Sequence, residues 1–233
     1  MKRWTWIAVG LAATLLAACQ AAPGVVSPHQ RLTAQAAARQ EASSLYPLVP
    51  GARWEYRLLQ RQDQGPVREK PMSITVASAE AQPSGVTMAV LERRYETWAP
   101  PATRVLRTAE KVVLSRLSDP VDGPSITIMQ LPLEVGARWP GRPLSGGNKE
   151  TIIPRGPERV TVPAGTYEAE RVDHLIAYAP GGTDTLSYWY ARGVGVVKMI
   201  ERSTLFQGDG VIRLEVTGEL ETYEVPSRPG TGD

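Results

Sequence analysis

The stretch 160–200 most constrains the fold of this chain, because it alternates short β-type runs with clusters of glycine and proline. Proline fixes φ and glycine supplies the positive φ that tight reversals need, so such clusters separate the strands of hairpins. Three clusters divide the stretch: Pro163-Ala164-Gly165, Pro180-Gly181-Gly182 and Arg192-Gly193-Val194-Gly195. The pattern predicts successive hairpins built from four strands.

Period-two alternation of apolar and polar residues continues on both sides of this stretch. The clearest run lies near the C-terminus, where Ile212, Leu214 and Val216 alternate with Arg213 and Glu215. Alternation of this kind indicates a sheet with one wet face, which is typical of antiparallel sheets. We therefore predict that residues 45–224 form an all-β domain, a strongly curved antiparallel sheet of roughly ten to twelve strands. Either a half-open barrel or a sandwich fits the pattern.

An internal repeat suggests that this domain contains two related halves. The segment 46–54, YPLVPGARW, is echoed 85 positions later by 131–139, LPLEVGARW. Each copy reads as a loop, a glycine turn and the start of a strand that anchors its tryptophan, Trp54 or Trp139, in the core. The alternative is an Arg-Trp binding pair displayed twice on the surface.

The N-terminus predicts export and a lipid anchor. Lys2 and Arg3 precede an apolar run at 7–16 that is too short for a permanent membrane helix. The run ends in Leu16, Ala17, Ala18 and Cys19, which resemble the lipobox of bacterial lipoproteins. That resemblance implies acylation of the Cys19 thiol, removal of a signal peptide at 1–18 and attachment to a membrane. An ordinary signal peptide with a chance cysteine is the alternative.

The segment that follows predicts a tether. Residues 19–44 are rich in Ala, Gln, Pro and Ser, and 31–42 can form an alanine-rich helix with too few large apolar residues to dock firmly. Gln20, rather than aspartate, follows the cysteine, which by the rule for enteric bacteria favours the outer membrane, facing the periplasm. At the other end, residues 225–233 predict a disordered tail.

Charge and cysteine content exclude several classes of function. The chain has 26 basic and 24 acidic residues, and loss of the signal peptide removes only Lys2 and Arg3, so the mature chain is neutral. A neutral chain predicts no nucleic-acid partner. Because the single cysteine is assigned to the lipid, no disulfide framework is expected, and the fold must depend on its core. We expect a monomer.

Residues suited to catalysis or metal binding are few. His174 lies within a predicted strand, and no positioning motif accompanies Ser187 or Ser145, the serines it could activate. Asp119 and Asp122 form a turn without the ordered oxygen ligands of a calcium loop. We therefore predict no catalytic residues, no metal site and no cofactor.

The candidate ligand-binding residues are three adjacent aromatic residues. Tyr188, Trp189 and Tyr190 place large groups on both faces of one predicted strand, which a sheet with one wet face does not require. Either one face lines a groove for an apolar ligand, or both faces are covered by plain core packing, which is the simpler interpretation.

Three motifs carry a resemblance to a family. Pro-Leu-x-x-Gly-x-x-Trp, the segment 162–167 (VPAGTY) and the segment 189–198 (WYARGVGVVK) are similar to those of a widespread group of bacterial lipoproteins without an assigned function. More remotely, the group is similar to the half-barrel lipoprotein carriers of the LolA/LolB type. This resemblance implies a concave sheet able to shelter an acyl chain, and it brings no catalytic residues.

Three functions are consistent with these features. The first is a cell-envelope lipoprotein that binds an apolar ligand or a lipidated partner on its concave sheet. The second is an envelope adaptor that binds other proteins, and the third is a hydrolase.

Overall fold

All strands in the described part of the chain belong to one antiparallel sheet. The computed structural model describes residues 36–37, 40–179, 182–207 and 210–226. The strands are β1 (Arg53–Gln62), β2 (Arg68–Ala81), β3 (Thr87–Tyr95), β4 (Thr103–Arg107), β5 (Lys111–Arg116), β6 (Ser125–Gln130), β7 (Trp139–Pro143), β8 (Lys149–Val162), β9 (Gly165–Ala177), β10 (Thr183–Ala191), β11 (Gly195–Gln207) and β12 (Gly210–Glu224). Their order in the sheet is β6-β5-β4-β3-β2-β1-β12-β11-β10-β9-β8-β7.

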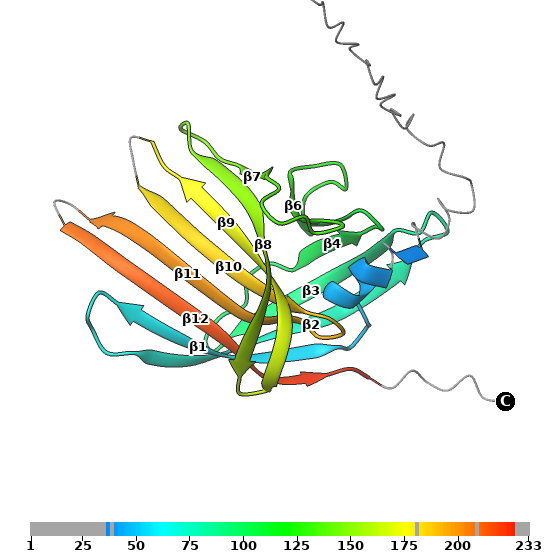
Figure 1. Ribbon diagram of the computed structural model, residues 1–233, viewed down its shortest axis with the longest axis horizontal. Helices are drawn as coiled ribbons and strands as arrows, with labels where there is room; N and C mark the ends of the chain where they lie inside the picture. Colours follow the sequence, from blue (N-terminus) through cyan, green and yellow to red (C-terminus); the bar gives the residue numbers. More distant parts are fainter. Residues whose placement is uncertain (1–35, 38–39, 180–181, 208–209, 227–233) are drawn as a thin grey trace, which may run out of the picture.

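The sheet curls until its two edge strands, β6 and β7, approach each other (Figure 1). No ladder joins these edges within the described residues, but the Trp139 indole of β7 donates a hydrogen bond of 2.6 Å to the Thr127 carbonyl of β6. The result is a nearly closed barrel whose hydrophobic core lies on the inner face. The predicted all-β, strongly curved antiparallel sheet is confirmed, and one continuous sheet replaces the alternative of a two-sheet sandwich.

Alternation along the strands separates an inner from an outer face. In β1, Trp54, Tyr56 and Leu58 are buried, whereas the residues between them are more exposed. The stretch 160–200 forms the end of β8, then β9 and β10, and the start of β11, as its hairpin pattern predicts. The first reversal depends on Gly165, whose φ of +139° lies in the region that favours glycine.

The repeated segment opens two halves of six strands each, β1–β6 and β7–β12. Both glycines before the repeated tryptophan have positive φ, +79° at Gly51 and +82° at Gly136. Each of these glycines donates its N–H to a carbonyl of the second strand of its half, Val76 in β2 at 2.8 Å and Pro154 in β8 at 2.9 Å. Trp54 and Trp139 are both buried. The sequence repeat is therefore a structural element that starts each half with a core tryptophan.

Helical residues 40–45 dock against the end of the barrel where β10 turns into β11. Ala42 and Leu45 are buried in the core, and the Gly193 N–H donates a hydrogen bond of 2.8 Å to the Ser44 carbonyl. The expectation that the helix at 31–42 would not dock firmly is therefore wrong for residues 40–42, whose Ala42 is buried, and Leu45 is part of the predicted domain 45–224. Two apolar residues three positions apart lie on one helical face, and this spacing is sufficient for a short contact.

Candidate functional site

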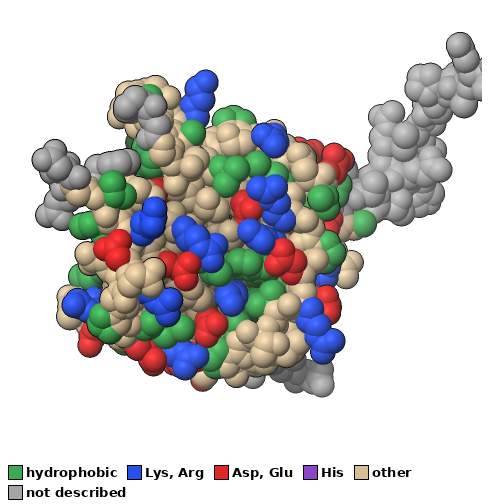
Figure 2. Space-filling model, turned by 60° about the vertical axis from the view of Figure 1, so that its left-hand side comes forward, with side chains coloured by type: hydrophobic (Ala, Val, Ile, Leu, Met, Phe, Trp, Pro, Cys, Tyr) green, Lys and Arg blue, Asp and Glu red, His purple; other side chains and the backbone are tan. Residues whose placement is uncertain are grey.

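A cavity of about 300 Å³ lies on the inner face of the sheet, toward the end that carries the β1–β2 and β11–β12 turns. We call that end the mouth. The walls come from β1, β2, the end of β3 and the segment after it, β10, β11 and β12. The apolar residues among its lining are Leu58, Met72, Tyr95, Trp98, Leu186, Tyr188, Met199, Ile200 and Val216. Figure 2 brings this side of the molecule forward and shows hydrophobic side chains in a hollow ringed by charged ones.

Strand register brings the lining residues together from distant parts of the chain. Tyr188 in β10 faces Met199 in β11, and Met199 faces Gly218 in β12. A Cβ atom on Gly218 would lie 2.7 Å from Met199 and 3.1 Å from Leu58, closer than side chains tolerate. Glycine at this position therefore leaves room for the two larger side chains that line the cavity.

Trp98 stands at the rim of the cavity in the loop between β3 and β4. Its ring stacks on Tyr95 with centroids 4.8 Å apart and an interplanar angle of 8°, yet 58% of the residue is exposed. An indole held in place by one stacked ring leaves a large apolar surface in water. Trp98 was not predicted as a site residue, because its one signal in the sequence is a tryptophan between polar residues and Ala-Pro-Pro at 96–101.

The structure divides the three predicted aromatic residues between the two faces of β10. Tyr188 lines the cavity, and Tyr190 lies on the same face, with its ring centroid 6.2 Å from Tyr188 and 6.2 Å from Tyr46. Trp189 lies on the opposite face, where its indole donates a hydrogen bond of 2.8 Å to Glu158 and its ring lies 5.2 Å from the Arg171 guanidinium carbon. The strand thus brings Tyr188 and Tyr190 together and separates Trp189 from them.

An ionic network fills the outer face beside Trp189. Asp173 is 3% exposed and accepts hydrogen bonds from Arg155 at 2.7 Å, Arg171 at 2.8 Å and the Ser187 hydroxyl at 2.7 Å. Burial raises the pKa of Asp173, but these three donors outweigh burial and lower it overall. The Ser187 hydroxyl is therefore part of this network on the outer face, where it donates its hydrogen bond to Asp173.

His174 lies on the inner face, paired with Glu150. The two side chains are buried, with His174 Nδ1 3.0 Å from Glu150 Oε1, and Arg142 donates its backbone N–H and its Nε to Glu150 Oε2. Burial raises the pKa of Glu150, but the hydrogen bonds from His174 and Arg142 outweigh this effect and lower it to about 2. His174 and Ser187 therefore belong to different faces of the sheet, and this arrangement does not form a nucleophile–base pair.

The remaining sequence candidates do not extend the site. The Asp119 N–H donates to the Arg116 carbonyl, as in an ordinary turn, and Arg104 donates to the Asp119 carbonyl. Across the described ranges, no cluster of three or more His, Cys, Asp or Glu residues could hold a metal ion. Nor does any helix of the described part combine the length and apolar character needed to span a membrane. The lipobox at 16–19, including Cys19, and His29 lie outside the described residues.

The barrel defines a fold class that is also found among solved structures. A protein inferred to be exported, with a YmcC-like fold, from Bacteroides fragilis NCTC 9343 has a TM-score of 0.50 and 13% sequence identity, covering 78% of this chain and 99% of that chain. At this identity the likeness shows the fold alone.

Two further solved structures have lower scores. One is a protein inferred to be a lipoprotein from Parabacteroides distasonis ATCC 8503, with a TM-score of 0.46, 17% identity and coverage of 78% of this chain and 98% of that chain. The other is a LolA superfamily protein from Nitrosomonas europaea, with a TM-score of 0.32, 10% identity and coverage of 84% and 94%. No protein-family model matches the chain, and no curated protein matches its sequence.

Proposed function

We propose that this chain is a non-enzymatic, lipid-anchored protein of the bacterial cell envelope that binds an apolar ligand, or the acyl chain of a lipidated partner, inside its barrel. The observation that carries the proposal is the cavity whose apolar lining includes Leu58, Leu186, Tyr188 and Met199. The lipobox ending at Cys19 supports the anchor, and Gln20 supports an outer-membrane site facing the periplasm. A fold shared with a protein inferred to be exported is consistent with a place in the cell envelope.

The size and lining of the cavity narrow the ligand. Its volume of about 300 Å³ lies at the small end of the range for ligand sites, so a single chain or a small ring system suits it better than a diacyl lipid. Exposing apolar surface to water costs roughly 25 cal/mol per Å² of accessible area. A ligand that covers the apolar walls removes this cost, which favours binding. Trp98 at the rim adds surface that a bound chain would cover.

Binding of an uncharged apolar dye, N-phenyl-1-naphthylamine, tests the cavity. The Cys19→Ser chain, which keeps every described residue and removes the acylation site, should bind the dye saturably. Leu186→Glu should weaken binding at least about tenfold, because the dye would desolvate the new carboxylate. Thr185→Glu adds the same charge to the opposite face of β10 and should leave binding unchanged. Absence of saturable binding, or equal losses in both variants, would refute the proposal.

Acylation of Cys19 is tested separately. Cells that express the chain should incorporate an alkyne analogue of palmitate into it, and the chain should fractionate with membranes. Cys19→Ser should lose both the label and the membrane association. A variant that keeps its label would show that the lipid is attached elsewhere or that the lipobox is not used.

A protein-binding adaptor is the second candidate, and exposed apolar residues favour it. Five of the large apolar residues that are at least 40% exposed lie in or beside the turns and loops at the mouth: Val67, Trp98, Leu117, Val121 and Val211. Apolar side chains gathered at one end are typical of an interaction surface. If the chain is an adaptor, Trp98→Ser should weaken binding of the protein partner, whereas Leu186→Glu, inside the cavity, should leave that binding unchanged.

A further inference from the structure

One cation of the barrel, Arg93 in β3, lies on the inner face. Arg93 pairs with Ile74 of β2, and Ile74 pairs with Trp54 of β1, whose side chain is in the core. Residues directly opposite each other in a sheet share a face, and residues two apart in one strand do so as well. Leu91 and Tyr95, on either side of Arg93, both pack in or against the core. The Arg93 side chain therefore starts from the concave wall.

Within the part of the chain that the structure describes, no ion pair or side-chain hydrogen bond involves Arg93. Arg142, by contrast, is paired with Glu150 at 3.0 Å. Arg93 is exposed, and an exposed guanidinium on the concave wall can form charge-assisted hydrogen bonds with an anion that joins it. The geometry leaves Arg93 available for an anion brought by a ligand.

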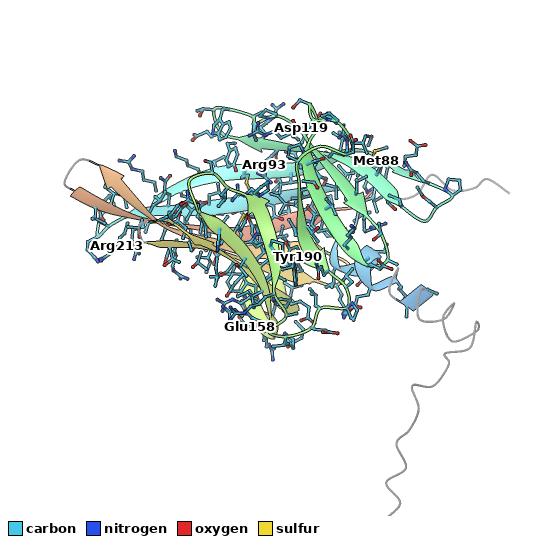
Figure 3. The ribbon with its side chains drawn as sticks, turned by 90° about the horizontal axis from the view of Figure 1, so that it is seen from above. Met88, Arg93, Asp119, Glu158, Tyr190 and Arg213 are labelled. Carbon is cyan, nitrogen blue, oxygen red and sulfur yellow. The ribbon has the colours of Figure 1, made fainter. Side chains whose placement is uncertain are left out.

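The charge of Arg93 acts on two tyrosines that pack against the core, Tyr46 and Tyr188. Burial raises the pKa of Tyr46 to about 12 and also raises the pKa of Tyr188, and in both cases the positive charge of Arg93 opposes burial. The rings of Tyr46, Tyr190 and Tyr188 follow one another at 6.2 Å spacings. Figure 3 labels Arg93 on the β3 side and Tyr190 on the β10 side of the molecule. Phenol donors and a guanidinium thus share the region next to the cavity.

The direction of β3 places Arg93 farther from the mouth than Tyr95. The strand runs toward the mouth, so Arg93 precedes Tyr95 and Trp98, which line the cavity, and Arg93 itself is exposed to solvent. Three charged side chains line the cavity itself: Lys70, Glu96 and Glu201. The two carboxylates repel an anion, so an anionic group is better placed beside Arg93 than among the lining residues.

We infer that the ligand is a single-chain amphiphile with an anionic head, a carboxylate or a phosphate, bound with its head inward beside Arg93 and its tail in the apolar cavity. This inference rests on the proposed function and specifies the class of ligand. Charge-assisted hydrogen bonds from a guanidinium are about twice as strong as neutral ones, and the tyrosine hydroxyls can add donors. The tail then contacts Leu58, Met199 and Trp98 on the way to the mouth.

Displacement of N-phenyl-1-naphthylamine from the Cys19→Ser chain by three ligands of equal chain length tests the inference: decanoate, decyl phosphate and 1-decanol. An apolar cavity alone prefers the alcohol, because an anion loses more hydration on entering it. We expect at least one of the anions to displace the dye at a concentration about tenfold lower than decanol does, a difference typical of one charge-assisted bond. Which anion does so distinguishes a fatty acid from a phosphate monoester.

Variants identify the group that reads the charge. Arg93→Gln should weaken binding of the preferred anion about tenfold or more, since the charge-assisted hydrogen bond is lost. Binding of decanol should change by less than about twofold. Arg94→Gln makes the same charge change one residue away, opposite Ser73 on the outer face, and should preserve the preference.

Three results would overturn the inference. Decanol could displace the dye as well as either anion does, or Arg93→Gln could weaken the binding of decanol and of the anion equally. In the third, Lys70→Gln rather than Arg93→Gln would remove the preference for the anion over decanol. If no probe binds at all, the proposed function falls with it. If decanol binds without a preference for an anion, the cavity stands and only the anionic head is refuted.

Discussion

The two halves of the barrel start with the same element but bury different kinds of side chain. In β1–β6 the buried side chains are hydrophobic, whereas β8–β11 bury six polar or charged residues: Glu150, Asp173, His174, Asp184, Ser187 and Ser203. Burial of polar groups is unfavourable unless each finds a partner. The same starting element is therefore compatible with two ways of stabilising a curved sheet.

The two halves also differ in strand length and in how their strands are covered. β4, β5 and β6 contain 5 or 6 residues, whereas β8, β9 and β11 contain 13 or 14. In the second half both faces of β10 are covered, since Tyr190 is buried on the inner face and Trp189 on the outer face. A face that is covered without an apolar layer needs hydrogen-bonded polar groups, and the network around Asp173 supplies them. The repeated topology therefore specifies where the strands lie, whereas the coverage of each strand face determines whether it buries apolar or polar side chains.

The largest expected effect tests the equivalence of the two starting elements. Trp54→Ala and Trp139→Ala should each lower the free energy of unfolding by about 3–5 kcal/mol, because each leaves a cavity in the core. Trp54→Ala should lie at the upper end, since Trp54 also stacks on Tyr223 with centroids 5.2 Å apart, and β1 is paired on both sides. Urea denaturation followed by circular dichroism measures both. A nearly neutral Trp139→Ala would show that the second copy does not anchor its half.

The second prediction tests the polar network of the second half. Asp173→Ala should lower the free energy of unfolding by about 3 kcal/mol, since it leaves Arg155, Arg171 and Ser187 without their acceptor. Glu215→Ala is the control, because its partner Arg202 and Glu215 itself are exposed, and exposed pairs contribute about 1 kcal/mol or less. Equal losses in the same urea experiment would mean that burial of the network is unimportant.

The smallest effect is a pH dependence confined to the second half. The pKa of Glu150 falls from 4.5 to about 2 on folding, so its contribution to stability is complete above pH 4.5 and is lost as the pH falls toward 2. Between pH 6 and pH 3.5 this single group should remove about 1 kcal/mol. In Glu150→Gln, the difference between the free energies of unfolding at pH 6 and pH 3.5 should be smaller by that amount, measured by urea denaturation at both pH values. Parallel profiles for the two proteins would contradict the assignment.

Local patterns predicted the fold well because they depend on short-range chemistry. The glycine and proline clusters at 163–165 and 192–195 mark reversals whatever the distant surroundings are, and period-two alternation identified β1 and β12. The docking of residues 40–42 was missed, since a single Ala42–Leu45 contact is too short to stand out in an alanine-rich segment.

The site was harder to predict, because its walls come together only through register. Alternation shows that Tyr188 and Trp189 point to opposite faces, but not which face is concave. Leu58 and Met199 meet Tyr188 only after β12 pairs with both β1 and β11. Arg93 had no sequence signal at all, since it is one of two adjacent arginines and only pairing with Ile74 distinguishes it from Arg94.

The pairing of the first strand with the last has a consequence for how the chain could be rearranged. Arg53 faces Glu224, so the start of the first strand and the end of the last strand are neighbours, while the link at 131–138 joins the halves at the seam between β6 and β7. Joining the present ends by a short linker and opening new ends within 131–138 would give a circular permutant that interrupts no strand. The same cut without the linker would give two six-strand fragments, each with its own core tryptophan, that are suited to complementation through the β1–β12 ladder.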